Sequence, residues 1–336
     1  MTTIIGRACR KSSTGMASSK SNVETASRRE MHMARRIVIK AGTPVVTHCD
    51  GKVALGRIGS LVEQIAILRQ QGREVVVVSS GAIATGVERM RKTIALNQTV
   101  HDTMLGTNSN DAARPAPSAA VGQALLMNLY ETMFSKYNLS CAQVLLTEDE
   151  LSDGETLSQV RDTTMELLSL GTIPIINDND AITSRQVPVM DEDTGEIRWD
   201  NDSLAAVLAS TLRADLLVML TDLDSLYTPA PSGSASNHPV RLPVYHPEAK
   251  LVRKGIFHSD AMTMSDSARG KFAGSTRMSE EGMDALVESA KSAVAGGVRT
   301  AVVATGHHPL SLVRLVRGED IGTLFVPEQV PPSSRL

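Results

Sequence analysis

Short runs of apolar, mostly β-branched residues alternate with longer segments of helical spacing along most of this chain. The runs lie at residues 37–39, 75–78, 141–146, 173–176, 216–220 and 299–304. Between them, apolar residues recur at helical spacing at 58–71, 121–137, 156–170, 204–212 and 283–296. This alternation predicts an α/β fold with a largely parallel sheet that is covered by helices on both faces.

Composition narrows the class of partner. The chain has 336 residues, of which 42% are hydrophobic, enough for one large domain or two smaller ones. A net charge of -3 and an aromatic content of 3% supply neither the basic face nor the stacking platform of a nucleic-acid-binding protein. No apolar run has the length of a membrane span. We therefore expect a small-molecule partner, without nucleic acid or membrane.

The three cysteines and the chain ends bear on location and domain limits. Cys9, Cys49 and Cys141 are scattered, which fits a reducing compartment such as the cytoplasm and gives no metal-ligand spacing. Residues 1–33 have the composition of a disordered extension, residues 34–326 form the predicted domain, and the proline-containing residues 327–336 form an extended tail. The terminal Ser334-Arg335-Leu336 is similar to the Ser-Lys-Leu peroxisomal address, so a peroxisome-like organelle is the alternative location, and a chance match is the simpler reading.

Two further stretches, residues 93–117 and 227–245, are rich in polar residues and proline and are predicted to be loops.

Carboxylates and carboxamides follow the buried run at 173–176. Asn177-Asp178-Asn179-Asp180 comes directly after it, and Asp200-Asn201-Asp202 lies about twenty residues further on. An unpaired buried charge costs several kcal/mol, so packing alone gives no reason for such residues at a strand end. We interpret the two groups as a site for a cationic or zwitterionic ligand, although such residues also form ordinary turns.

Three other strand ends carry residues suited to phosphate or nucleotide. Lys40-Ala41-Gly42 offers a charge and a glycine that lets backbone N–H groups come close to a phosphate. The small residues from Ser79 to Gly86 suit an anion site at a helix N-terminus, or else a turn that packs a helix closely on a strand. Neither is a Walker A loop or a dinucleotide fingerprint. Thr221-Asp222 is interpreted as a shelf for the nucleotide, with helix capping as the alternative.

Taken in order, these segments resemble the amino acid kinase family. The resemblance runs from about residue 36 to 325 and is carried by segments 77–86, 120–123, 143–147, 175–180, 200–205 and 220–222. It implies a three-layer α/β/α sandwich. Within the family the segments are most similar to the branch that phosphorylates the γ-carboxylate of L-glutamate.

The resemblance also implies roles for individual residues. Lys40 would contact the transferred phosphoryl group, Gly42 would lie in its loop, and Asp200 would orient the catalytic lysines. The other implied assignments are acceptor binding by Ser80, Gly81, Asn177, Asp180, Asn201 and Asp202, and nucleotide binding by Thr221 and Asp222.

Two departures from the family pattern affect the phosphate site. Leu286 stands where the family has a second phosphate-binding lysine, so Lys271 and Arg277 are the candidates to replace it. Pro44 replaces a small hydroxyl residue in the first loop. The chain is also expected to lack the C-terminal PUA domain that many relatives carry.

The activity that the resemblance implies is ATP-dependent phosphorylation of glutamate in the first step of proline biosynthesis. Mg²⁺ would arrive with ATP rather than on a protein site, and relatives are commonly homo-oligomers inhibited by proline. Two alternatives stay open. One is a different acceptor, as in the aspartate, acetylglutamate, carbamate and uridylate kinases, and the other is a catalytically weak regulatory or binding protein.

Overall fold

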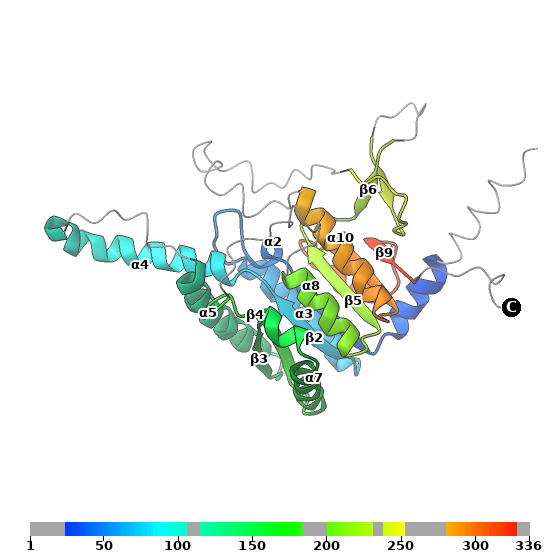
Figure 1. Cartoon of the computed structure of the whole chain (residues 1–336), viewed down its shortest axis with the longest axis horizontal. Helices are drawn as coiled ribbons and strands as arrows, with labels where there is room; N and C mark the ends of the chain where they lie inside the picture. Colours follow the sequence, from blue (N-terminus) through cyan, green and yellow to red (C-terminus); the bar gives the residue numbers. More distant parts are fainter. Residues whose placement is uncertain (1–23, 106–114, 184–199, 231–237, 253–279, 328–336) are drawn as a thin grey trace, which may run out of the picture.

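A seven-stranded sheet forms the centre of the computed structural model, which describes residues 24–105, 115–183, 200–230, 238–252 and 280–327 (Figure 1). The strand order is β3-β4-β2-β1-β5-β8-β9, and all neighbours are parallel except β8 and β9. The bounds are β1 Arg36–Ala41, β2 Glu74–Ser79, β3 Cys141–Leu146, β4 Ile173–Asp178, β5 Leu216–Thr221, β8 Thr300–Thr305 and β9 Thr323–Phe325. The predicted parallel sheet is confirmed.

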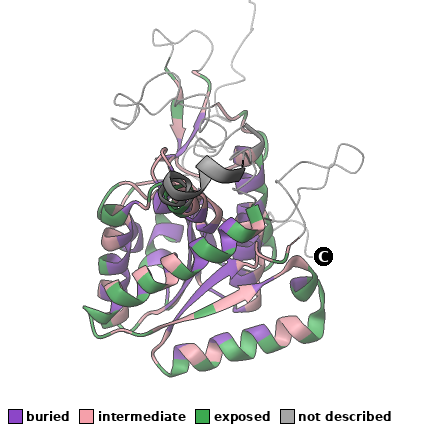
Figure 2. Ribbon diagram, turned by 90° about the vertical axis from the view of Figure 1, so that its left-hand side faces the viewer, coloured by how far each residue is buried: buried purple, intermediate pink, exposed green. Residues whose placement is uncertain are grey.

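Helices cover the two faces of this sheet, and the strand residues alternate between two cores. Ile37 packs toward α3 (Leu55–Gln70), α5 (Pro115–Ser135) and α11 (Ser311–Val316). Val38 packs toward α7 (Gly154–Ser169), α8 (Asn201–Thr211) and α10 (Glu280–Ala295). Both side chains are fully buried, and each such burial stabilises the fold by about 1.5 to 3 kcal/mol. Figure 2 shows the buried strands between the helices, which confirms the three-layer α/β/α class.

The order of the strands reverses at β1, because the chain adds strands first on one side of β1 and later on the other. From β1 the chain continues into β2 on one side of it, and later into β5 on the other. The connections that leave the carboxyl ends of neighbouring strands diverge there and open a crevice, where ligands of such sheets bind. This topology predicts that the site lies around the end of β1.

Residues 24–33 correct the predicted disordered extension, because they form a helix that packs on the domain. Met31 of this helix is 1% exposed. The guanidinium of Arg28 donates to the carbonyl of Glu319 at 2.6 Å and to Asp320 Oδ1 at 2.6 Å. These long-range partners, which local composition does not reveal, hold the segment in place. Residues 1–23 lie outside the described ranges.

The loop predicted at 93–117 is also corrected. Helix α4 (Ala82–Leu105) runs well into it and α5 begins at Pro115 (Figure 1). The Thr93 hydroxyl donates to the Arg89 carbonyl one turn earlier at 3.1 Å. A polar composition with little apolar periodicity therefore does not by itself end a helix.

A two-stranded antiparallel hairpin, β6 (Leu226–Thr228) with β7 (Val240–Leu242), replaces part of the loop predicted at 227–245. Thr323 Oγ1 of β9 ties it to the sheet, because it accepts from Leu226 N at 2.9 Å and donates to the Leu242 carbonyl at 2.6 Å. Each strand is too short to show an alternation in the sequence. The terminal Ser334-Arg335-Leu336 lies outside the described residues.

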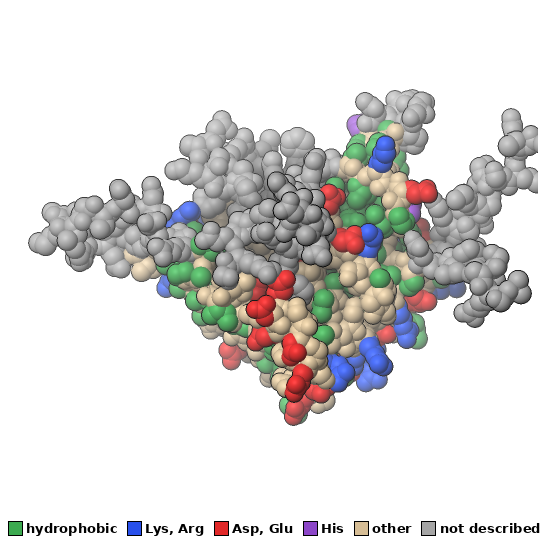
Figure 3. Space-filling model, viewed as in Figure 1, with side chains coloured by type: hydrophobic (Ala, Val, Ile, Leu, Met, Phe, Trp, Pro, Cys, Tyr) green, Lys and Arg blue, Asp and Glu red, His purple; other side chains and the backbone are tan. Residues whose placement is uncertain are grey.

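Acidic side chains gather where Figure 1 draws α7 on the face seen in Figure 3. Several acidic residues sit in the first turns of α7 and of α6 (Glu148–Ser152). Asp153, the N-cap of α7, accepts from Thr156 N at 2.9 Å and from its hydroxyl at 2.6 Å, which lowers the pKa of Asp153. Such acids stabilise helix N-termini, which explains this surface without a ligand.

Candidate active site

The candidate residues meet at the carboxyl edge of the sheet. Lys40 lies near the end of β1, and Ser80 directly follows β2. Asn177 is the second-last residue of β4, and Thr221 is the last residue of β5. Because β1, β2, β4 and β5 are neighbours and parallel, their ends lie side by side. The structure therefore brings together residues that are up to 181 positions apart in sequence, at the point that the topology indicates.

Lys40 is held in a buried ion pair with Asp202. Lys40 shares the sheet face of Val38, the face covered by α8, and Asp202 lies in the first turn of that helix. Lys40 Nζ is 2.8 Å from Asp202 Oδ1, and the side chains are 7% and 9% exposed. Burial raises the pKa of Asp202 to about 6, against the lowering effect of Lys40, and nearby Asp200 adds to the rise.

Asp200 begins the helix that carries Asp202. It is the N-cap of α8, and its Oδ1 accepts from Asp202 N and Ser203 N, each at 2.9 Å. Asn201 joins this helix to β4, because its Oδ1 accepts from Asp178 N at 3.4 Å. In this structure the ion-pair partner of Lys40 is thus Asp202, and the cap positions Asp202. A direct role of Asp200 in orienting lysines stays a prediction.

The end of β4 carries two buried polar groups with different partners. Asn177 is 1% exposed; its Nδ2 donates to Gln123 Oε1 at 2.9 Å and its Oδ1 accepts from Asp178 N at 2.9 Å. Asp180 is more solvent-accessible, yet burial and the neighbouring Asp178 raise its pKa to about 6. Burial also raises the pKa of Asp178, although the Thr183 hydroxyl donates to it at 3.2 Å. Such raised pKa values are typical of carboxylates that lack a partner until a ligand binds.

A turn that requires glycine follows β2. Ser80 N donates to the Ala41 carbonyl at 3.0 Å, which links the ends of β2 and β1. Gly81 has φ +95°, and a Cβ there would lie 3.0 Å from Val46 Cγ1. Any side chain at this position would therefore be strained. The turn lies immediately before α4, where an anion-binding turn would be expected.

Gly86, by contrast, does not belong to this turn, although the sequence segment includes it. It lies one turn into α4, and a Cβ on it would be 1.7 Å from the Ser118 carbonyl oxygen of α5. Gly86 thus allows close contact between two helices rather than between helix and strand, and the anion-site interpretation is confined to the residues before α4.

Gly42 keeps space beside the lysine. Its N–H donates to the Leu220 carbonyl at 3.0 Å, and a Cβ there would lie 3.2 Å from Lys40 Nζ. Pro44 occupies the first turn of α2 (Thr43–Val46), where its missing N–H has no cost. His307, after β8, bonds through Nε2 to the Pro44 carbonyl at 2.9 Å. That histidine fixes the first loop, a role that the sequence did not reveal.

Thr221 and Asp222 lie across the crevice from the acidic cluster. The Thr221 hydroxyl donates to Asp222 Oδ1 at 3.0 Å, and the Thr221 carbonyl accepts from Gly306 N at 2.9 Å. The second of these bonds joins the ends of β5 and β8. Their role in nucleotide binding stays a prediction.

Leu286, the residue expected from sequence at the position of the family's second lysine, is a core residue. Leu286 is 0% exposed and packs in the apolar cluster between α8, α10 and the sheet. An ammonium at that place would be buried among apolar groups at a cost of several kcal/mol. Lys271 and Arg277, the candidates to replace it, lie outside the described residues.

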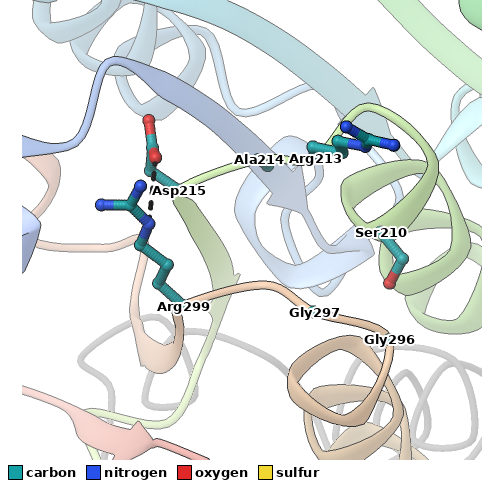
Figure 4. Close-up of a pocket in the computed structure, with 7 residues that line it drawn as sticks. All are labelled: Ser210, Arg213, Ala214, Asp215, Gly296, Gly297 and Arg299. Atoms are coloured by element: carbon teal, nitrogen blue, oxygen red, sulfur yellow. Dashed lines mark ion pairs between the residues drawn. The ribbon is translucent and has the colours of Figure 1, made fainter.

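One cavity lies at the opposite, amino edge of the sheet. It measures about 400 Å³ and is lined by Ser210, Arg213, Ala214, Asp215, Gly296, Gly297 and Arg299. Figure 4 shows Arg299 beside Asp215, with an ion-pair distance of 3.5 Å. The ends of α8 and α10 border it, so its arginines lie where positive charge complements helix C-termini. None of the candidate residues lines it.

Within the described ranges, no group of three or more His, Cys, Asp or Glu side chains is arranged to hold a metal ion. None of the helices in those ranges combines the length and hydropathy of a membrane span.

The sequence of this chain is similar to those of known proteins. The model of the Amino acid kinase family matches residues 35–305. Delta-1-pyrroline-5-carboxylate synthase of Solanum lycopersicum is 39% identical over 87% of this chain and 37% of its own length. Glutamate 5-kinases of Dehalococcoides mccartyi and Chromohalobacter salexigens are each 35% identical, over 90% and 94% of this chain and 71% and 72% of theirs. The chain thus spans little more than a third of the synthase.

Among solved structures, UMP kinase from Ureaplasma parvum superposes with a TM-score of 0.45 and 14% identity, covering 88% of this chain and 99% of that one. The sequence matches alone carry the assignment. Since the family model spans every strand of the sheet except β9, and two curated relatives align over nine-tenths of the residues, this chain belongs to the amino acid kinase family.

Proposed function

We propose that this chain transfers the γ-phosphoryl group of ATP to the γ-carboxylate of L-glutamate and forms L-glutamyl 5-phosphate, the first step of proline biosynthesis. The observation that carries the proposal is the buried Lys40–Asp202 pair at the strand ends that also carry the Ser80–Gly81 turn and Asp180, with the pKa of both Asp202 and Asp180 raised to about 6. The curated relatives named glutamate 5-kinase support this choice of substrate.

The reaction needs two anions to be held in line. A γ-carboxylate oxygen attacks the terminal phosphorus of ATP, the bond from that phosphorus to the bridging oxygen breaks, and ADP leaves with that electron pair. The carboxylate is already ionised, so no proton has to be removed. The protein therefore contributes positioning and positive charge, and Lys40 supplies the charge at the end of β1.

The acceptor is proposed to bind with its three charged groups separated. The γ-carboxylate lies at the Ser80–Gly81 turn, where the Ser80 N–H holds the turn to Ala41 and the glycine lets the anion approach the backbone at the start of α4. The ammonium and α-carboxylate lie at Asn177, Asp180, Asn201 and Asp202. Binding of the ammonium lowers the raised pKa of Asp180 and Asp202, because an adjacent positive charge favours the ionised carboxylate.

Mg²⁺ is proposed to enter with ATP, and Thr221 and Asp222 to contact the nucleotide. The Lys40–Asp202 pair carries no net charge when both groups are ionised, so a triphosphate beside it needs further positive charge. Magnesium bound to phosphate oxygens would supply this positive charge and neutralise part of the negative charge of the triphosphate.

We further propose a cytoplasmic homo-oligomer that proline inhibits. Light scattering after size exclusion measures the assembly, and a proline titration of the initial rate measures the inhibition.

A coupled ADP-release assay with glutamate, with aspartate and with no acceptor tests the proposal. We expect turnover that depends on glutamate. Equal rates with aspartate would indicate another acceptor within the family, and a rate independent of either amino acid would contradict the function.

The burial of Leu286 favours one rival, a catalytically weak binding protein, because this position supplies no phosphate-binding cation. Lys271→Ala and Arg277→Ala, separately and together, test whether another side chain supplies it. We expect the double variant to lose most of its turnover. Wild-type turnover in the double variant would leave the nucleotide's magnesium, or this rival, to account for the phosphate site.

A further inference from the structure

One face of α5 is buried beside the acceptor side of the site, and the roles proposed above do not use it. Its buried residues are Ser118, Ala119, Gly122, Gln123, Leu126, Tyr130 and Phe134. The stripe is mostly apolar or small, as expected for packing. Two of its members, Gln123 and Tyr130, bring polar groups into this apolar contact. Seven residues apart, they lie on the same side of the helix.

Gln123 fixes the orientation of Asn177. Gln123 Oε1 accepts from Asn177 Nδ2 at 2.9 Å in a buried contact, while Asn177 Oδ1 accepts from Asp178 N. If the Asn177 amide turned by 180°, acceptor would face acceptor and donor would face donor. The amide therefore has one stable orientation, in which Nδ2 carries a second N–H that could donate to a bound substrate.

Tyr130 fixes the end of β2 in the same way. Its hydroxyl is 2.9 Å from Ser79 Oγ, which in turn points toward the Ser80 carbonyl at 3.4 Å. Tyr130 is 0% exposed, and burial raises its pKa to about 12, so the phenol stays neutral and keeps its hydrogen. Ser79 immediately precedes the Ser80–Gly81 turn.

The backbone of α5 makes a third contact on the other side of this turn. A Cβ on Gly122 would lie 1.8 Å from the Ala82 carbonyl oxygen in the first turn of α4. No side chain fits there, so the two helices touch backbone to backbone. Together the three contacts hold the residue before the turn, the residue after it, and Asn177 at the next strand.

We propose that Gln123 and Tyr130 are positioning residues that hold the acceptor site in its binding geometry, with α5 as their common support. The inference rests on the proposed function, since it takes the acceptor to be an amino-acid carboxylate bound at the Ser80–Gly81 turn and Asn177. Neither side chain touches the reacting atoms in this account. Gln123 acts through Asn177, which is proposed to bind the acceptor, and Tyr130 acts through Ser79, which precedes the Ser80–Gly81 turn.

Gln123→Met and Tyr130→Phe remove the two hydrogen bonds with little change in volume. Each should raise the KM for glutamate by roughly three- to tenfold and leave the KM for ATP unchanged, because one neutral hydrogen bond has about that effect. Gln64→Met is the matched control. Gln64 is a similarly buried glutamine on α3, whose Oε1 accepts from Leu312 N at 2.8 Å.

The control separates positioning from stability. All three variants should lose thermal stability, but only the α5 variants should change the KM for glutamate. If the α5 variants had wild-type KM values, or if Gln64→Met raised the KM as much, the inference would be wrong.

Hydrogen–deuterium exchange decides the inference even if the wild-type protein does not phosphorylate glutamate, an outcome that contradicts the proposed function alone. Amides of residues 79–86 should exchange faster in Tyr130→Phe than in the wild-type protein or in Gln64→Met. Unchanged exchange in that segment would overturn the inference, whatever the substrate is.

Discussion

The two edges of the central sheet both carry charged side chains, but they use them differently. At the amino edge, Asp215 Oδ2 accepts the backbone N–H groups of Arg35 at 2.9 Å and Arg36 at 3.0 Å. The Arg36 guanidinium pairs with Glu74 at 2.8 Å across β1 and β2. These charges satisfy backbone groups and join neighbouring strands. Their environment is part-buried, and their contribution is to stability.

At the carboxyl edge, the charged groups lower the stability of the folded protein. Asp202 is buried with Lys40, and the pKa of both Asp202 and Asp180 rises to about 6, mainly through burial. A raised pKa means that the ionised carboxylate is less favourable in the folded protein than in the unfolded chain. The difference between the edges indicates that the carboxyl edge is arranged for a ligand.

Substitution of Lys40 should give the largest effect. Lys40→Ala removes the ammonium that acts on the phosphoryl group, at a cost of about 3 to 4 kcal/mol, so kcat should fall a hundredfold or more while the KM for glutamate changes little. Initial rates of the folded variant measure this. Arg36→Ala is the comparison at the amino edge and should retain kcat. A Lys40→Ala variant with normal kcat would remove the lysine from the mechanism.

Asp180→Asn should weaken acceptor binding by a smaller amount. A hydrogen bond to a charged group contributes about 1.5 to 3 kcal/mol, so the KM for glutamate should rise tenfold or more with an unchanged KM for ATP. If the KM for ATP rose instead, the acidic cluster would belong to the nucleotide side and the two sides of the site would be reversed.

The same variant should be more stable than the wild-type protein at pH 7.5. The folded-state pKa of Asp180 lies above its unfolded value, so its stabilising effect is full below about pH 4 and is lost as pH rises through 6. Asparagine carries no charge, so above pH 6 the variant should have an unfolding free energy about 1 to 2 kcal/mol higher than that of the wild-type protein. Urea unfolding at pH 7.5 and at pH 4 measures it. A gain that persisted at pH 4 would exclude this cause.

Asp215→Ala should have the smallest effect and the opposite sign. It leaves the N–H groups of Arg35 and Arg36 without their acceptor, which should lower the unfolding free energy by about 1 kcal/mol. Both KM values and kcat should stay at wild-type levels. A change in the KM for glutamate would link the two edges and weaken the comparison.

The sheet could be predicted from sequence because its parallel strands are buried on both faces. Each reads as a continuous apolar run, so 216–220 and 173–176 identify β5 and β4 to within two residues. The polar residues that follow these runs could then be assigned to one edge. Helix α4 and the hairpin were missed, since their contacts come from distant residues rather than from local periodicity.

Pairings within the site were harder to predict than its members. The bond between Asn177 and Gln123 joins residues 54 positions apart, and that between Ser79 and Tyr130 joins residues 51 apart. Asp202 was predicted to meet the acceptor ammonium and is here the partner of Lys40. A single sequence gives residue types at strand ends, whereas the partner of each side chain depends on how helices cross the sheet.

Trapping of the product tests the central claim most directly. An acyl phosphate reacts with hydroxylamine to give a stable hydroxamate, and mass spectrometry distinguishes the γ from the α position. With ATP, Mg²⁺, glutamate and hydroxylamine, the account predicts γ-glutamyl hydroxamate in amounts equal to the ADP released, and a rate of its formation that is lower by a hundredfold or more in Lys40→Ala. ADP release without the hydroxamate, or equal hydroxamate from aspartate, would contradict it.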